Sequence, residues 1–242
     1  MATVVEFSDV VYSIDGRRLV GPLSFTAEEG KTLVLVGASG SGKTTTLRLV
    51  NRLVEPTSGI VLVDGKDAKD WDAIALRRRI GYVIQEVGLF PHLSVARNIG
   101  VVPRLMGDNN AAVGARVHEL LELVGLPPAD FSNRRPHELS GGQRQRVGVA
   151  RALAADPPIL LCDEPFGAVD PFTRSELQKE FKRLAEGLQK TILFVTHDVN
   201  EAVRLGDRIA VFEQGEIRFL GSMDEFATST NPVVVALRES NR

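Results

Sequence analysis

The sequence predicts an α/β fold with a parallel sheet covered on both faces, and three patterns support this prediction. From residue 159 onward, short apolar runs of strand length alternate with helical segments. Near the N-terminus, an Asp-Gly pair separates two strand-like runs, which favours an antiparallel hairpin. Between these regions, the chain from about residue 87 has helical character. We therefore expect a parallel core, a β-rich N-terminal part and a helical insertion.

The β-rich part is expected to contain two tight turns. Residues 10–14 and 17–25 flank Asp15-Gly16, and Asp64-Gly65 follows the apolar run at residues 60–63. An Asp-Gly pair tolerates the positive φ angles of a two-residue hairpin turn. Both segments therefore predict antiparallel strands.

The helical insertion is assigned to about residues 87–156, and the core to residues 1–86 and 157–242. In the insertion, apolar residues recur at a spacing that places them on one face of a helix, and Gly125 ends this helix. These residues are Val113, Val117, Leu120, Leu121 and Val124. In the core, residues 159–162, 191–195 and 208–212 are expected to be buried strands. A helix between the first two strands is marked by Leu177, Phe181, Leu184 and Leu188.

Composition argues against several classes of function. The 242 residues include 29 Lys and Arg against 31 Asp and Glu, and a net charge of −2 does not favour nucleic-acid binding. No uncharged run approaches the ~18 residues of a transmembrane helix, and the first residues lack the pattern of a signal peptide. The single cysteine, Cys162, excludes an intrachain disulfide and fits a reducing compartment. With four histidines, one cysteine and no His/Cys cluster, a zinc site is not expected.

The most informative segment is a glycine-rich stretch between an apolar run and a helical pattern. Its residues are Gly37, Ala38, Ser39, Gly40, Ser41, Gly42, Lys43 and Thr44. This is G-x-x-x-x-G-K-[ST] between strand and helix, where backbone N–H groups converge on phosphate oxygens. The charge of Lys43 suits the outer phosphates, and the Thr44 hydroxyl can ligate Mg²⁺. The segment predicts a nucleoside triphosphate site; the alternative is a glycine-rich turn with a solvated lysine.

Two further motifs carry chemistry. Ser140 and Gln143 have the spacing of a capping box, and Gly141-Gly142 beside them leaves backbone N–H groups open to an anion. Alone, this motif predicts only a well-capped helix that runs to about Ala155. Asp163-Glu164 ends an apolar run, where Asp163 can hold a phosphate-bound Mg²⁺ and Glu164 can polarise an attacking water. An isolated acidic pair would instead be a solvated loop.

In this order, the motifs resemble those of ATP-binding subunits of ABC transporters, and the resemblance covers essentially the full chain. It implies a P-loop NTPase (RecA-like) core with an antiparallel β subdomain and an inserted α-helical signature subdomain. By position, Lys43, Thr44 and Thr45 hold phosphates and Mg²⁺. Asp163 is then the carboxylate on the metal side, and Glu164 the catalytic base.

The resemblance also gives roles to residues that carry no signal alone. Gln85 matches a glutamine that senses Mg²⁺ and water and couples to the permease. His197 would contact the γ-phosphate, although it also reads as a loop histidine beside the capping residue Asp198. Tyr12 is placed to stack on adenine; a strand tyrosine is otherwise core or surface. Asp170 lies in a loop that crosses the dimer interface and also reads as an ordinary N-cap.

The resemblance implies an assembly. Two subunits would sandwich two ATP molecules, with the lysine loop of one chain facing the Ser140 helix start of the other. Residues 87–95 are unusually apolar for a loop and are either local core or a groove for a helix of a transmembrane permease. The subunit would then lie peripherally at the cytoplasmic face of the cell membrane, with a substrate-binding protein as an indirect partner.

Residues 85–95, Asn98-Ile99, 101–103 and 163–171 narrow the resemblance to ATPases of osmoprotectant importers. These take up glycine betaine, proline, choline and related quaternary amines. Many carry CBS modules after the ATPase; the sequence here runs to Arg242, so control by such modules is not expected. Alternatives are a soluble ABC-type ATPase, an importer ATPase for another small solute such as an amino acid, and a binding switch that scarcely hydrolyses.

Overall fold

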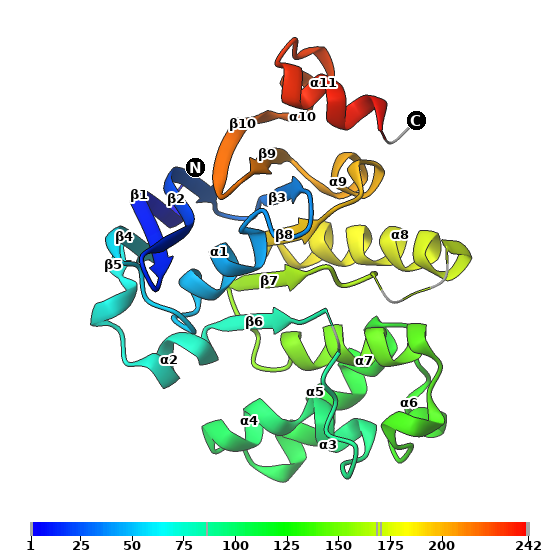
Figure 1. Ribbon diagram of the computed structural model, residues 1–242. Helices are drawn as coiled ribbons and strands as arrows, with labels where there is room; N and C mark the ends of the chain where they lie inside the picture. The colour runs from blue at the N-terminus through cyan, green and yellow to red at the C-terminus, as the bar shows by residue number, and fades with distance from the viewer. Residues whose placement is uncertain (1, 86, 168, 170, 241–242) are drawn as a thin grey trace. The chain divides into compact units, whose positions relative to one another are not determined.

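The computed structural model describes residues 2–85, 87–167, 169 and 171–240 (Figure 1). The chain forms two compact units, residues 1–77 with 189–242 and residues 78–188, and each is described by itself. No helix in the described ranges is both long enough and apolar enough to cross a membrane.

An antiparallel sheet occupies the N-terminal part of the first unit. It comprises β1 (Thr3–Ile14), β2 (Arg17–Glu28), β4 (Ser58–Val63) and β5 (Lys66–Asp67), in the order β2-β1-β4-β5. Both predicted Asp-Gly turns are confirmed, because Asp15 and Gly16, and likewise Asp64 and Gly65, have φ values between 49° and 74°. Stacking of Phe7 on Phe25, with ring centroids 4.5 Å apart, joins β1 to β2 on the buried face.

The first unit also contains the strands that carry the phosphate loop. These are β3 (Thr32–Gly37), β8 (Thr191–Thr196), β9 (Arg208–Glu213) and β10 (Glu216–Ser222). β3 lies between β8 and β9 and is parallel to both, whereas β10 is antiparallel to β9. All residues of β3 and β8 are buried, as expected for parallel strands covered on both faces. The strands predicted at 191–195 and 208–212 are confirmed, each one residue longer.

Short helices complete this part of the chain. They are α1 (Lys43–Val50), η1 (Ala68–Asp70), α2 (Ala73–Arg78), α9 (Val199–Leu205), α10 (Met223–Thr228) and α11 (Pro232–Glu239). α1 follows β3 through the phosphate loop, and its Leu47, Leu49 and Val50 are buried. Their burial anchors the helix whose N-terminus bears the glycine-rich loop.

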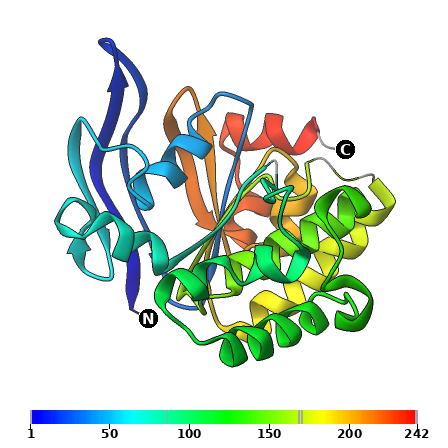
Figure 2. The same cartoon turned by 90° about the horizontal axis from the view of Figure 1, so that it is seen from below.

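The second unit pairs two parallel strands with a group of helices. The strands are β6 (Ile80–Val83) and β7 (Ile159–Asp163). The helices are α3 (Val95–Ile99), α4 (Val101–Met106), α5 (Asn110–Leu123), α6 (Pro128–Phe131), η2 (Pro136–Glu138), α7 (Gly141–Leu153) and α8 (Pro171–Leu188). In Figure 2 the green helices from α3 to α7 lie together.

The helix predictions in this unit are confirmed. Val113, Val117, Leu120 and Leu121 form the buried face of α5, and Gly125 follows the helix end with a φ of 67°. Leu177 and Phe181 are buried on α8. Helices α3 to α7 lie between residues 95 and 153, inside the predicted insertion, while the boundaries of the two subdomains stay a prediction.

Candidate functional site

The phosphate loop joins the end of β3 to the start of α1. Gly42 is the N-cap of α1 and has a φ of 102°, which is accessible to glycine at little cost. A Cβ on this residue would lie 2.9 Å from Cγ2 of Val20, so the position also requires a small residue. Ala38, Ser39 and Gly40 are exposed at the crest of the loop. The backbone of the crest is therefore open to a ligand at the N-terminus of α1.

Lys43 is held inside the loop. Its side chain is 4% exposed, and its Nζ donates hydrogen bonds to the carbonyl oxygens of Gly37 and Ala38, both at 2.8 Å. A third contact joins Nζ to Oγ of Ser41 at 3.4 Å. These bonds fix the ammonium group beneath the crest, where its charge can act on an anion bound to the loop.

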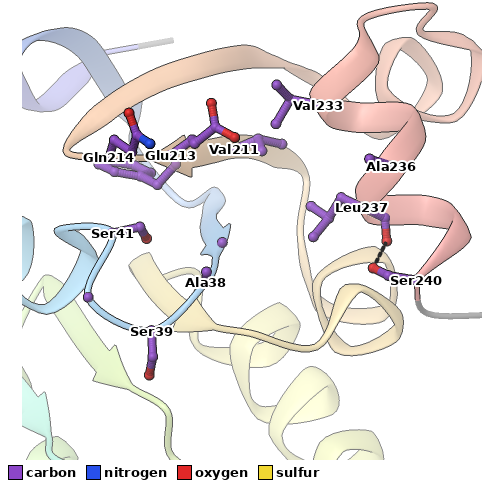
Figure 3. Close-up of a pocket in the computed structure, with 13 residues that line it drawn as sticks. Ala38, Ser39, Ser41, Val211, Glu213, Gln214, Val233, Ala236, Leu237 and Ser240 are labelled. Atoms are coloured by element: carbon purple, nitrogen blue, oxygen red, sulfur yellow. Dashed lines mark hydrogen bonds between the residues drawn. The ribbon is translucent and has the colours of Figure 1, made fainter.

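A cavity with a volume of about 580 Å³ adjoins the phosphate loop (Figure 3). Residues 37–41 form one wall, the end of β9 another, and Val233, Ala236 and Leu237 of α11 a third. In Figure 3, Ser41 and Gln214 lie on the side away from α11. Sequence reasoning did not associate α11 with the loop, because nothing local in residues 232–239 indicates where the helix packs.

His197 lies at the same sheet edge as the phosphate loop. β3 and β8 pair in parallel with Val36 opposite Thr196, so Gly37 and His197 begin the loops at adjacent strand ends. The His197 side chain is exposed. The next residue, Asp198, caps α9 by accepting hydrogen bonds from the N–H groups of Asn200 and Glu201 at 2.8 and 3.3 Å. The capping interpretation of Asp198 is thereby confirmed, and it fixes the turn that carries His197.

Tyr12 is part of β1 and pairs with Val20 on β2. Its side chain is half-buried. Val20 in turn lies close to Gly42, the N-cap of α1. The antiparallel sheet therefore approaches the start of α1 through the strand that pairs with Tyr12, which is compatible with the predicted adenine contact.

In the second unit, Asp163 and Glu164 end β7. Asp163 is 5% exposed, and one of its carboxylate oxygens accepts a hydrogen bond from the hydroxyl of Tyr82 at 3.3 Å. Glu164 is half-buried and has a φ of 44°, an unusual value for a residue with a side chain. The N–H of Gly167 donates to its carbonyl oxygen at 3.0 Å, which closes the turn.

Gln85 follows the neighbouring strand. β6 and β7 are parallel, with Val83 opposite Cys162, so Gln85 and the acidic pair leave the same edge of this two-stranded segment. The Gln85 side chain is exposed. The unit therefore brings together the ends of the strands that carry three of the predicted catalytic and metal-binding residues.

Arg151 of α7 anchors the segment after Gln85, and sequence reasoning missed it. Its guanidinium group donates to the carbonyl oxygens of Val87 and Gly88 at 2.6 and 2.7 Å. Burial lowers the pKa of Arg151 from its ordinary value. Gly148, one turn earlier on α7, permits this approach, because a Cβ there would lie 2.4 Å from Cγ1 of Val87. No local pattern marks either residue.

The predicted capping box at the start of α7 is confirmed. The N–H of Gln143 donates to Oγ of Ser140 at 3.2 Å, and the Gln143 Oε1 accepts from the Ser140 N–H at 2.9 Å. Ser140 and Gly141 are exposed, whereas Gly142 is buried. α7 ends at Leu153, two residues before the predicted end near Ala155. Its N-terminus is thus well formed and accessible.

The apolar segment after Gln85 is organised by Asn98. This residue is fully buried on α3; its Oδ1 accepts from the N–H of Phe90 at 2.7 Å, and its Nδ2 donates to the carbonyl oxygens of Phe90, Leu93 and Ser94 at 3.0–3.1 Å. Phe90 itself is 43% exposed. Its side chain is therefore presented at the surface of this unit rather than packed in its core.

Not every predicted site residue can be placed. Asp170, predicted to lie in the loop that crosses a dimer interface, falls outside the described residues, as do Ala168 and Glu86. The phosphate loop, Tyr12 and His197 belong to the first unit, and Gln85, Ser140, Asp163 and Glu164 to the second.

Known proteins resemble this chain over most of its length. The profile of a family described as ABC transporter matches residues 20–167. The glycine betaine/carnitine/choline transport ATP-binding protein OpuCA of Bacillus subtilis (strain 168) is 50% identical over 210 residues, which cover 87% of this chain and 55% of that protein. The glycine betaine uptake system ATP-binding protein YehX of Escherichia coli (strain K12) is 46% identical over 238 residues, which cover 98% of this chain and 74% of that protein.

Solved structures confirm the predicted fold class. The structure of cbiO1 from Clostridium perfringens, described as part of the ABC transporter complex cbiONQ, matches with a TM-score of 0.86 and 26% identity, over 100% of this chain and 95% of that one. A dimeric post-hydrolysis state of the ATP-binding cassette MJ0796, bound to ADP and Pi, matches with a TM-score of 0.80 and 33% identity. The match covers 90% of this chain and 98% of that one. The chain spans just over half the length of relatives such as OpuCA.

Proposed function

The chain belongs to the ABC transporter family, and we propose that it is the ATP-hydrolysing subunit of a membrane importer. The observation that carries the proposal is the phosphate loop. Lys43 is held inward by two carbonyl groups while the crest of the loop stays exposed at the start of α1. Backbone N–H groups and a fixed ammonium charge at a helix N-terminus are what a triphosphate requires.

ATP would bind first through its phosphates. The hydrogen-bond donors would be the N–H groups at the start of α1, the ammonium group of Lys43 and the hydroxyl groups of Thr44 and Thr45. Tyr12 would stack on the adenine ring. Both hydroxyl-bearing residues are half-buried on the first turn of α1, where the helix dipole also favours an anion.

The residues present fit Mg²⁺. Thr44, Gln85 and Asp163 offer only oxygen ligands, which this hard cation prefers, and the Tyr82 hydroxyl orients the Asp163 carboxylate. Among the described residues, no group of three or more His, Cys, Asp or Glu side chains gathers into a metal site. That agrees with an ion bound by one carboxylate and by the phosphates of the nucleotide. When bound, Mg²⁺ would offset the charge that develops on those phosphates.

Hydrolysis would depend on Glu164, Gln85 and His197. Glu164 would orient a water molecule and accept its proton as the water oxygen bonds to the γ-phosphorus and the bond to the β–γ bridging oxygen breaks, so that ADP leaves. Glu164 lies in a left-handed turn that the N–H of Gly167 closes, which fixes its backbone at the end of β7. Gln85 would orient the same water, and His197 would contact the γ-phosphate.

The active form would be a homodimer that sandwiches two ATP molecules. The start of α7 in one subunit, with Ser140, Gly141, Gly142 and Gln143, would meet the γ-phosphate held by the other subunit. Support comes from the well-capped and exposed N-terminus of α7 and from similarity to a cassette solved as a dimer. Asp170 would lie at this interface.

The transported solute is proposed to be an osmoprotectant such as glycine betaine, proline or choline. The proposal rests on 46–50% identity to proteins named for transport of glycine betaine, carnitine and choline. Permease subunits would cross the membrane and contact the segment that presents Phe90. A substrate-binding protein would deliver the solute, and the subunit would be peripheral to the membrane.

The direct test is steady phosphate release from Mg-ATP by the purified chain. We expect Lys43→Ala to abolish turnover, because the phosphate loop loses its fixed charge. Lys69→Ala removes an exposed lysine of the same unit and should retain turnover. Wild-type turnover in Lys43→Ala would overturn the proposed site. Recovery of a permease with the tagged chain from membranes tests the importer assignment.

A further inference from the structure

A small cavity lies between α7 and α8 in the second unit. Its volume is about 20 Å³, and one water molecule needs roughly 10–15 Å³. Val149 of α7, Phe166, and Leu177 and Phe181 of α8 provide apolar walls. An apolar cavity of this size would be expected to stay dry. Polar groups in its wall change that expectation.

The first of these groups is the side-chain amide of Gln145. The residue is 2% exposed, it lines the cavity, and among the described residues its Nε2 has no hydrogen-bond partner. A buried donor without an acceptor is costly, and such groups in folded proteins are usually satisfied by protein or by ordered water. The amide therefore needs an acceptor that fits the cavity.

The second polar residue of the lining is Glu180, whose side chain is 41% exposed. It pairs with Arg146, whose Nη2 lies 3.0 Å from the Glu180 Oε1, while Nη1 of the same arginine donates to the carbonyl oxygen of Val124 at 3.0 Å. Arg146 and Glu180 both line the cavity. A carboxylate has about four acceptor positions, so one ion pair does not exhaust it. A suitable ligand accepts from Gln145 and donates to Glu180.

We propose that this cavity is a binding site for one ordered water molecule, which accepts a hydrogen bond from Nε2 of Gln145 and donates one to the carboxylate of Glu180. The water links α7, which begins beside Ser140, to α8. It also lies against Phe166, two residues after Glu164. Water is the ligand of choice because it is small, neutral, and both donor and acceptor.

The proposal is tested on the whole chain by crystallography at high resolution and by magnetic relaxation dispersion, which counts long-lived internal waters. We expect a solvent peak at about 2.7–3.2 Å from Nε2 of Gln145 in the wild-type protein. Gln145→Leu should lose this peak and one long-lived water. Val149→Ala widens the same cavity but keeps the amide, so it should retain the water.

Two results would overturn the proposal. One is a wild-type crystal structure in which the cavity is dry and Nε2 of Gln145 donates to a protein acceptor. The other is a Gln145→Leu protein that keeps the same solvent peak, because the amide would then not be what binds it. The wild-type structure decides the matter even if the leucine variant does not fold. ATP hydrolysis does not enter the test, so failure here leaves the proposed function untouched.

Discussion

At the scale of single residues, the chemistry depends on side chains that the fold holds in restricted positions. Lys43 is buried with its Nζ on two carbonyl oxygens, and Glu164 has a positive φ that is rare for glutamate. The sequence could identify both residues, because their motifs are local and contiguous. It could not show the hydrogen bonds of Lys43 or the backbone angle of Glu164, because these depend on neighbouring strands and turns.

A prediction at this scale concerns Asn98. Asn98→Ala removes the acceptor of the Phe90 N–H and the donor to three carbonyl groups, so we expect the protein to lose about 1–3 kcal/mol of stability. Urea unfolding followed by circular dichroism measures the change. Asn200→Ala alters an exposed asparagine and should shift the midpoint little. A midpoint for Asn98→Ala equal to that of the wild type would show that these bonds do not stabilise the segment.

At the scale of elements, the predictable features are those with local causes. The Asp-Gly turns, the capping box at Ser140 and the buried face of α5 follow from neighbouring residues. The contact of Arg151 with Val87 and Gly88 does not, because it joins residues more than 60 positions apart. The same holds for α11, whose approach to the phosphate loop depends on the path of the chain after β10.

A prediction at the element scale concerns coupling to the permease. Phe90 is 43% exposed on a segment fixed by Asn98 and Arg151, which suits a contact with a partner helix. We expect Phe90→Glu and Leu93→Glu to abolish transport in the assembled complex while the isolated subunit still hydrolyses ATP. Transport measured on the assembled complex and phosphate release measured on the isolated subunit of the same variant test this.

The matched control for coupling is Leu123→Glu, which introduces the same charge at another exposed apolar residue of the second unit. This variant should still transport. If Phe90→Glu lost ATP hydrolysis or folding together with transport, Phe90 would have a structural role in the subunit instead.

At the scale of the whole molecule, family membership rests on agreement between sequence and structural similarity. A family profile covers residues 20–167, and the complete chain superposes on a solved cassette with a TM-score of 0.86. Transport, however, belongs to an assembly, and no residue of this chain is expected to contact the solute. Substrate choice therefore has to be tested in cells.

We predict that cells lacking this subunit lose ATP-driven uptake of glycine betaine, choline or a similar quaternary amine. Radiolabelled uptake at high osmolarity measures this, with complementation by the wild-type chain and by Lys43→Ala as the positive and negative controls. Unchanged uptake of all these compounds, with loss of an unrelated solute, would contradict the proposed substrate and leave the family assignment intact.

If two subunits close around ATP and hydrolyse it, the Glu164→Gln variant should hold them in the closed state. This change keeps the side-chain shape but removes the proposed base, so turnover should fall by about 10²–10⁴-fold. Phosphate binding should survive because Lys43 and Ser140 are unchanged. ATP should then persist between the subunits and hold them together.

The decisive measurement is the molar mass of Glu164→Gln by light scattering with Mg-ATP. We predict a monomer without nucleotide or with ADP, and a dimer with Mg-ATP. A second change, Ser140→Arg, should prevent dimerisation, since a bulky side chain would block the exposed start of α7. The measurement is repeated on the assembled complex with its permease. A Glu164→Gln protein that binds ATP tightly but stays monomeric, and whose subunits do not close in the complex, would show that ATP does not hold two subunits together.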